Sequence, residues 1–446
     1  MFRNPTLHPR TGQPMPQIRK FGPAAVLVFV ITSIAIGALF GFRPGTLPEP
    51  AAKQSSSTLA LVGPLPSLAR IPWEGGPGYW SQFPKPRDAG WTDPSFFPIS
   101  VFMGKPEHAA ALKALGINTY MGAEHDGSSL SSITKQGIFV LPQDEWTQSE
   151  VGDDPQAVGW FISDECDMGI GCTGSNPAEN LADQISKVER VHAFGDGRFT
   201  MANYANGVLD TYWARGSMVQ LMKIVDVASV DKYAYTSPFV DDQMTHSPHW
   251  PAESSPASAG SYGWVVDRMR AYQDPAGQHP NWIFVEAAMP LLTDSGSRTI
   301  TPDQIEGAVW SAIIHEARGL AYFQHNNGSI CGFYSLVECD RARLDRVAEI
   351  NAEIQSLAPV LNTQSYQFSF NKSTDTMLKV YDGSAYIFAG IGLHQVPGLK
   401  TFVIPPEITG STVEVIGENR TLRVTDHSFS DTFENEFSHH TYRLTL

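Results

Sequence analysis

Residues 157–165 read AVGWFISDE and residues 281–287 read NWIFVEA, and these two short apolar runs decide the fold. Each run is short for a helix and apolar on both faces, which is typical of a strand buried in a parallel sheet. Both runs end in carboxylates, at Asp164, Glu165 and Glu286. The sequence therefore predicts two buried strands with acidic side chains at their carboxyl ends.

The same kind of run recurs along the chain and alternates with amphipathic helical stretches, which favours parallel strands joined by crossover helices. We expect eight strands, at residues 98–103, 117–122, 137–142, 157–163, 198–204, 225–235, 281–287 and 319–325. We expect helices at residues 108–115, 180–192, 213–224, 301–318 and 344–361. This pattern over residues 71–361 predicts a (β/α)₈ barrel, the TIM barrel of the α/β class.

Beyond about Leu361 the helical period disappears. Alternating runs separated by Gly, Asn and Asp turns take its place, at residues 365–370, 376–381, 384–390, 401–405, 411–417 and 441–446. Alternation of this kind is typical of strands with one buried face. Residues 362–446 are therefore expected to form a small all-β sandwich domain.

The amino-terminal segment is distinct from the rest. Residues 21–42 carry no charged side chain over 22 positions, about the length that a helix needs to cross a bilayer. Four basic residues precede this run and only Arg43 follows closely, which predicts a cytoplasmic amino terminus. We expect a cytoplasmic tail at 1–20, a transmembrane signal-anchor at 21–42 and a Pro- and Ser-rich tether at 43–70. A cleaved signal peptide, which would make the protein secreted, is the alternative.

The folded part is accordingly expected to begin near Ile71, outside the cytoplasm, and to fold without the anchor. Its four cysteines form two close pairs, Cys166 with Cys172 and Cys331 with Cys339. In an oxidising compartment each pair closes a short loop, so two disulfides are predicted. A zinc site is the alternative, but neither spacing is CxxC. No metal and no cofactor are expected.

Charge excludes one class of partner. The chain has 446 residues, with 31 Lys and Arg against 46 Asp and Glu, giving a net charge of -15. Phosphate backbones would be repelled over most of its surface, so nucleic acid is not an expected partner. Ten Trp and an aromatic content of 11% suit sugar stacking and suit a large core equally well.

The two carboxylate-bearing strands are strands four and seven of the predicted barrel, and they face each other across its mouth, where barrel enzymes keep their active sites. Glycoside hydrolysis requires two carboxyl groups, one to protonate the leaving oxygen and one to attack or to activate water. Either glutamate alone could simply cap a helix or pair with an arginine. Together, Glu165 and Glu286 indicate a glycosidase with a carbohydrate substrate.

With these two glutamates, residues 71–446 resemble the retaining glycosidases of clan A, the 4/7 superfamily of barrel hydrolases. The resemblance implies that Glu165, ending strand four, is the acid/base and that Glu286, ending strand seven, is the nucleophile. It also implies a strand-six tyrosine that hydrogen-bonds the nucleophile, here Tyr233, with Tyr235 as the fallback. The implied activity is double-displacement cleavage of an extracytoplasmic oligo- or polysaccharide.

One departure from that superfamily concerns Asp164, where an Asn that contacts the substrate is usual. An ionised Asp164 would accept hydrogen bonds only, and its charge would raise the pKa of Glu165. Other candidate substrate-binding residues end neighbouring strands: Asn203, Tyr235, Gln324 and His325.

Two alternatives remain beside the glycosidase. A metal-dependent barrel hydrolase is disfavoured because Phe102 and Met103 end strand one where an HxH pair would be expected. The second alternative is a non-catalytic, cell-surface glycan-binding barrel, which the presence of both glutamates disfavours.

Overall fold

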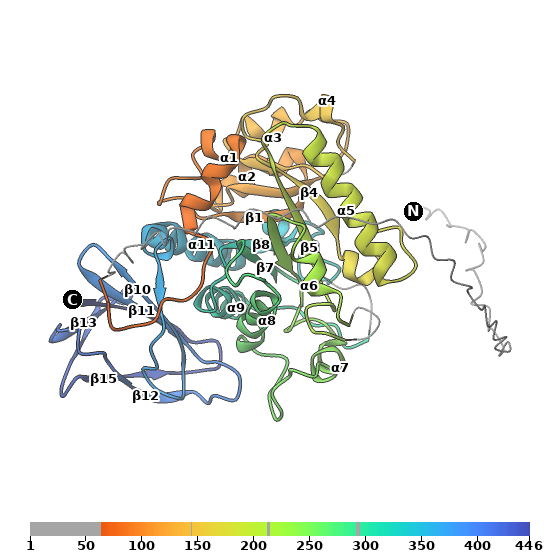
Figure 1. Cartoon of the computed structure of the whole chain (residues 1–446). Helices are drawn as coiled ribbons and strands as arrows, with labels where there is room; N and C mark the ends of the chain where they lie inside the picture. The colour runs from red at the N-terminus through yellow and green to blue at the C-terminus, as the bar shows by residue number, and fades with distance from the viewer. Residues whose placement is uncertain (1–63, 144, 212–214, 291–294) are drawn as a thin grey trace, which may run out of the picture. The chain divides into compact units, whose positions relative to one another are not determined.

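Eight parallel strands form a barrel in this computed structural model, which describes residues 64–143, 145–211, 215–290 and 295–446 (Figure 1). The strands lie in the order β3-β2-β1-β8-β7-β6-β5-β4. Parallel bridges from Val140 to Ala157 and from Gln143 to Phe161 join the two outer strands. The strand bounds are β1 Ile99–Gly104, β2 Thr119–Ala123, β3 Phe139–Leu141, β4 Gly159–Asp164, β5 Phe199–Tyr204, β6 Val227–Val230, β7 Asn281–Glu286 and β8 Gly319–Phe323. This confirms the predicted TIM barrel.

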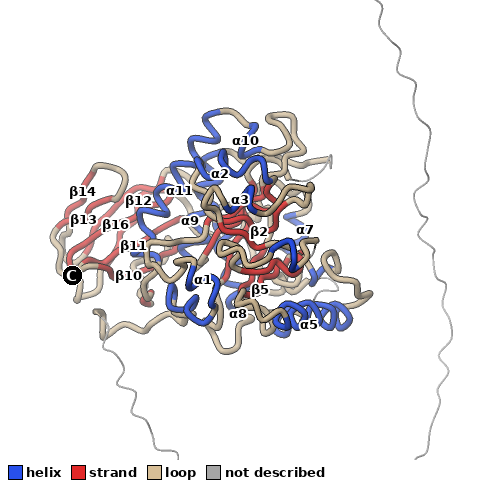
Figure 2. The backbone as a smooth tube through the Cα atoms, turned by 90° about the horizontal axis from the view of Figure 1, so that it is seen from above, coloured by secondary structure: helices blue, strands red, loops and turns tan. Residues whose placement is uncertain are grey.

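Helices surround the strands, as the view in Figure 2 shows. Their bounds are η1 Gly76–Gln82, α1 Pro84–Asp88, η2 Pro106–His108, α2 Ala109–Ala114, α3 Ser131–Thr134, α4 Gln148–Val151, η3 Cys166–Met168, α5 Pro177–Ala193, α6 Met218–Leu221, α7 Val240–Thr245, α8 Gly260–Ala271, α9 Pro302–Ile314, α10 Ser335–Glu338 and α11 Arg341–Leu361. Thr301 and Gln304 form a capping box at the start of α9, which fixes where that helix begins.

Successive side chains of each barrel strand point to opposite faces, so the apolar core has an inner cluster inside the barrel and an outer cluster between strands and helices. Along β7, Trp282 and Phe284 belong to an inner cluster, whereas Ile283 and Val285 belong to the cluster between strands and helices. Trp80 and Trp91, which precede β1, complete the inner cluster. Because side chains alternate along a strand, Glu286 lies on the same inward face as Trp282 and Phe284.

The carboxyl-terminal region is all-β, as predicted. One sheet has the order β14-β13-β16-β11-β10-β9, and β12 pairs with β15 in a second sheet. The two sheets enclose an apolar core that includes Phe402, Phe429 and Tyr442. The strand bounds are β9 Ser365–Tyr366, β10 Asp375–Tyr381, β11 Ser384–Gly390, β12 Gly398–Val403, β13 Thr412–Val415, β14 Arg420–Arg423, β15 Ser428–Phe433 and β16 His439–Thr445.

The folded part begins earlier than Ile71. Leu65 is 1% exposed and packs in the sandwich core. The amide of Ile71 donates to the Ser365 carbonyl at 3.0 Å, and the Gln367 amide donates to the Ala69 carbonyl at 2.8 Å. Residues assigned to the carboxyl end of the tether therefore extend the sandwich, a long-range pairing that local composition does not reveal.

The remaining amino-terminal predictions, for residues 1–20, 21–42 and the tether up to 63, fall outside the described residues. Within the described ranges, no helix has both the length and the apolar character that crossing a membrane requires.

Truncation tests the revised boundary. A fragment of residues 71–446 should have a free energy of unfolding about 3 kcal/mol lower than a fragment of residues 64–446, because it lacks Leu65 and leaves a cavity in the sandwich. Urea unfolding of the two fragments measures this difference. Leu65→Ala in the longer fragment should reproduce most of the loss, and equal stability of the two fragments would contradict the revised boundary.

Candidate active site

The carboxyl end of β4 departs from regular strand geometry where it presents its acidic side chains. A register shift between Phe161 and Ser163 interrupts the pairing of β4 with β5. Glu165 follows with φ 48°, in the left-handed region, which costs a non-glycine residue on the order of 1–3 kcal/mol. Its amide still donates to the Asn203 carbonyl at 2.9 Å. The bulge and the left-handed residue together turn the chain sharply at Glu165.

The loop after Glu165 is held from two sides. Cys166 and Cys172 form a disulfide, as predicted. The buried Asp167 carboxylate accepts hydrogen bonds from the amides of Ala205, at 3.1 Å, and Gly207, at 2.6 Å. A Cβ on Gly207 would lie 2.7 Å from Asp167 Oδ2, so glycine permits this approach. These contacts oppose the strain at Glu165 and fix its position.

Asn203, at the end of β5, joins the acidic groups of two strands. Its side-chain amide donates to Asp164 Oδ1 at 2.9 Å and to Asp231 Oδ1 at 3.1 Å. Ser229 donates to Asn203 Oδ1 at 2.9 Å and so fixes the orientation of the amide. The Asp231 carboxyl is in turn hydrogen-bonded to the Glu165 carboxyl. The expected contact residue Asn203 is thus part of a network around Glu165.

This network favours a protonated Glu165. Burial raises its pKa most, and the nearby charge of Asp231 raises it further, while Lys232 opposes the shift. Asp164 also contributes, as the sequence suggested, but less than Asp231. Burial followed by the Asp231 charge likewise raises the pKa of Asp164. Like charges in a desolvated site cannot all be ionised, so Glu165 retains its proton well above its usual range.

Glu286, at the end of β7, has different surroundings. It is fully buried, and two hydroxyl groups bind its carboxylate. Thr236 donates to Oε1 at 3.1 Å, and Tyr262 donates to Oε2 at 2.7 Å. Burial raises the pKa of Glu286 to about 7, whereas the hydrogen bonds from Tyr262 and Thr236 lower it. Hydroxyl donors favour the ionised form, so Glu286 carries a charge above neutral pH.

A cavity of about 160 Å³ lies beside Glu165. Asp231, Lys232 and Tyr233 line it, together with Met168, Ala205, Asn206, Ser237, Phe239, Val240 and Gln243. Glu286 does not line this cavity. Tyr233 lies close enough to both glutamates to be influenced by their charges. Burial raises the pKa of its hydroxyl most, followed by the charge of Asp231, and the charges of Glu165 and Glu286 raise it further.

The predicted roles of Tyr233 and Tyr235 require correction. Tyr262 and Thr236, not Tyr233, supply the side-chain hydrogen bonds to Glu286 found among the described residues. The Tyr235 hydroxyl donates to Glu436 of the sandwich instead, at 2.8 and 3.0 Å. The reason is that β6 ends at Val230 rather than at residue 235, so both tyrosines lie in the following loop.

Gln324 and His325, the two predicted substrate-binding residues that follow β8, have different surroundings. Gln324 is fully buried and lies on the same face as Tyr322, whose hydroxyl binds Asn351 of α11. Gln324 does not line the cavity beside Glu165, and its contact with a sugar stays a prediction. His325 faces the other way and is half-buried, and its ring stacks on Phe333 with centroids 4.8 Å apart.

Helix α8, which carries Tyr262, was not predicted from the sequence. Its signal was present, because Tyr262, Val265, Val266 and Met269 follow the i, i+3, i+4, i+7 spacing of a helix face, and all four are buried. Parallel strands also require a crossover, so a helix was needed between β6 and β7. Asp231 was passed over because the predicted strand six ran beyond it.

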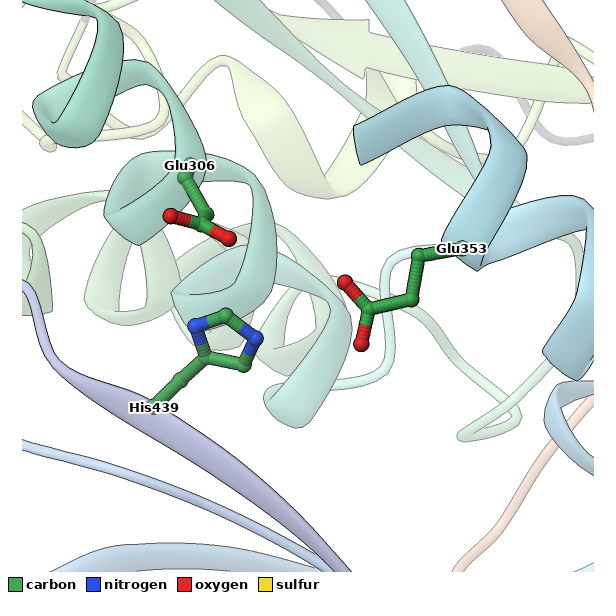
Figure 3. A group of neighbouring side chains, drawn as sticks. All are labelled: Glu306, Glu353 and His439. Carbon is green, nitrogen blue, oxygen red and sulfur yellow. The ribbon is translucent and has the colours of Figure 1, made fainter. Parts of the chain in front are cut away.

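Cys331 and Cys339 form the second predicted disulfide. Within the described ranges, one group of three side chains has ligand atoms close enough to hold a cation, Glu306, Glu353 and His439, whose ligand atoms lie within 4.8 Å of one another (Figure 3). They come from α9, α11 and β16 and do not line the cavity beside Glu165. Arg346 pairs with Glu306, so part of the negative charge is already compensated.

Comparisons with known proteins give structural likenesses only. No protein-family model and no curated protein matches the sequence. One similar structure, a glycoside hydrolase, is 9% identical, with a TM-score of 0.49 over 78% of this chain and 92% of that chain. A family 39 glycoside hydrolase from Bacteroides cellulosilyticus WH2 is 10% identical, with a TM-score of 0.48 over 79% and 82%. A family 5 glycoside hydrolase from Bacteroides vulgatus is 8% identical, with a TM-score of 0.47 over 78% and 89%.

The hydrogen bond from Tyr262 generates a prediction about Glu286. Tyr262→Phe should raise the pKa of Glu286 from about 7 by about one pH unit, because it removes a donor to the ionised form. Carbon-13 NMR titration of the glutamate carboxyls measures this directly. Tyr272→Phe, which removes a hydroxyl at the other end of α8 that binds the Val208 carbonyl, is the control and should leave Glu286 unchanged. An unchanged titration in Tyr262→Phe would show that this hydrogen bond does not stabilise the carboxylate.

Proposed function

We propose that this chain is a retaining glycoside hydrolase in which Glu165 is the general acid/base and Glu286 the nucleophile. The observation that carries the proposal is the contrast between two carboxyl groups at the mouth of one barrel. Burial and the Asp231 charge favour the protonated form of Glu165, whereas two hydroxyl donors favour the ionised form of Glu286. A pair of carboxyl groups with opposed preferences can divide the acid and nucleophile roles.

In the first step Glu286 attacks the anomeric carbon, while Glu165 gives its proton to the leaving oxygen. The bond from the anomeric carbon to that oxygen breaks as the glycosyl ester on Glu286 forms. In the second step Glu165, now ionised, takes a proton from water, and the water oxygen displaces Glu286 from the sugar. Two displacements at one carbon return the original configuration, which defines a retaining enzyme.

Burial of Glu286 bears on this mechanism, since the cavity beside Glu165 does not reach it. Attack requires a rearrangement that opens Glu286 to the sugar. We propose that Tyr233 moves in this rearrangement, because it lines the cavity and the charges of both glutamates contribute to raising the pKa of its hydroxyl. The same burial favours the rival function, a glycan-binding barrel without turnover. Kinetics of the variants below separate the two.

We further propose that the barrel works outside the cytoplasm, on an oligo- or polysaccharide, anchored by a helix formed by residues 21–42. Two disulfides near the barrel mouth support an oxidising compartment. The uncharged run of 22 residues supports a membrane anchor.

Truncation of each glutamate should produce a different kinetic defect. Glu286→Ala should lose essentially all turnover, because no glycosyl-enzyme forms. Glu165→Ala should still cleave dinitrophenyl glycosides, whose leaving group needs no protonation, and lose natural linkages. Azide should accelerate Glu165→Ala and yield a glycosyl azide of retained configuration. The measurement is a rate assay on a panel of aryl and natural glycosides.

Glu150→Ala provides the control, because this exposed glutamate lies outside the cavity and should keep wild-type rates. Wild-type rates in both Glu165→Ala and Glu286→Ala would reject this site. Glycan binding by a wild-type protein that cleaves no glycoside would establish the rival function.

The pH dependence should follow the two carboxyl groups. Glu286 must be ionised, so kcat/KM should fall as the pH drops through about 7. Glu165 must be protonated, so the rate should fall again at a pH well above the usual range of a glutamate. Asp231→Asn removes the charge that raises the pKa of Glu165, and it should move only the alkaline limb, to lower pH. An optimum near pH 4 to 5, where unperturbed glutamates titrate, would contradict these assignments.

A further inference from the structure

The turn between β15 and β16 lies directly against the barrel. A Cβ on Gly307 of α9 would lie 2.4 Å from the Phe437 Cβ and 2.9 Å from its Cα, so this approach depends on glycine at position 307. Asn435 holds the turn in shape, since its side-chain oxygen accepts from the Phe437 amide at 3.1 Å and from the Ser438 hydroxyl at 3.1 Å. The turn therefore has a fixed position on the barrel.

Glu436 extends from this turn to two groups of the barrel. Its carboxylate accepts from the Tyr235 hydroxyl at 2.8 and 3.0 Å and from the Ala259 amide at 2.9 Å. Ala259 is the N-cap of α8 and has no side-chain cap of its own. A carboxylate at the start of a helix accepts a hydrogen bond from an otherwise unpaired amide and interacts favourably with the positive end of the helix dipole. Glu436 thus caps a barrel helix from the sandwich domain.

Both groups that Glu436 holds are next to the donors of Glu286. Thr236 follows Tyr235 in the chain, and its hydroxyl binds Glu286 Oε1. Tyr262 lies in the first turn of α8, just after Ala259, and its hydroxyl binds Glu286 Oε2. The two positions also contact each other, because the rings of Tyr235 and Tyr262 are 5.7 Å apart and the Tyr235 amide points to the Tyr262 hydroxyl at 3.4 Å.

We propose that Glu436 is a positioning residue for Glu286, through which the sandwich domain sets the geometry of the active site. This inference rests on the proposed function. Glu436 fixes the Tyr235 loop and the start of α8, and these place the hydroxyls of Thr236 and Tyr262 against the nucleophile. The sandwich is therefore part of the catalytic unit, although none of its residues lines the cavity beside Glu165.

The test compares Glu436→Ala with Glu434→Ala in the full-length protein. Glu434 belongs to the same turn but is exposed, so its truncation changes the charge of the turn without removing the contacts to Tyr235 and Ala259. Glu436→Ala should lower kcat by about 10- to 100-fold, because the donors of Glu286 lose their fixed position. The acidic limb of its pH profile should move upward, whereas Glu434→Ala should match the wild type. Glu436→Gln keeps one acceptor oxygen and should lie between Glu436→Ala and the wild type.

The readouts separate this inference from the proposed function. Failure of the wild-type protein to cleave any glycoside would reject the proposed function, and the carbon-13 titration of Glu286 would then test the positioning alone. A higher pKa of Glu286 in Glu436→Ala and Glu436→Gln, with the wild-type value in Glu434→Ala, supports the inference. Wild-type kcat and titration in folded Glu436→Ala, or in Glu436→Gln if the alanine variant unfolds, would overturn it.

Discussion

Burial of several carboxyl groups at the mouth of one barrel is the constraint on which the rest of the structure depends. A desolvated carboxylate must be paired, hydrogen-bonded or neutralised by a proton. Around β4 and β6 the side chains of Asp164 and Asp231 share the Asn203 amide, and burial together with the Asp231 charge raises the pKa of Asp164 and of Glu165. At β7 the charge of Glu286 is instead stabilised by hydroxyl donors. The two glutamates therefore differ in their preferred protonation state, because burial and a neighbouring charge favour protonated Glu165, whereas hydroxyl donors favour ionised Glu286.

Glu165 and Glu286 are both held in place by residues that lie outside the barrel strands. The left-handed Glu165 is held by the neighbouring disulfide and by Asp167, whose carboxylate accepts backbone amides from the loop after β5. Glu286 depends on α8 and on the loop that follows β6. Glu436 of the sandwich contacts both of these elements, so the sandwich is joined to the parts of the barrel that carry the donors of Glu286. These contacts hold both glutamates in fixed positions in this structure.

Much of this could be predicted from the sequence. The apolar runs before Glu165 and Glu286 identified their strands, because burial on both faces leaves a continuous apolar pattern. Side-chain partners were harder to predict, since strand six was expected to end at residue 235 whereas β6 ends at Val230, which changes the residue that reaches the rim. This is why Asp231 was passed over and why Tyr233, rather than Tyr262, was expected to donate to Glu286. Leu65 and Glu436 make contacts far along the chain, which no local pattern encodes.

The most direct test of the central claim is the identity of the residue that becomes covalently attached to the sugar. Glycosides with fluorine at position 2 and a reactive leaving group slow the second displacement and so accumulate the glycosyl-enzyme. Peptide mass mapping after treatment with a panel of such sugars should show one added sugar, on Glu286, with Glu165 unmodified. Attachment to another residue, or turnover of the same sugars with inverted configuration and without any labelled peptide, would contradict the account.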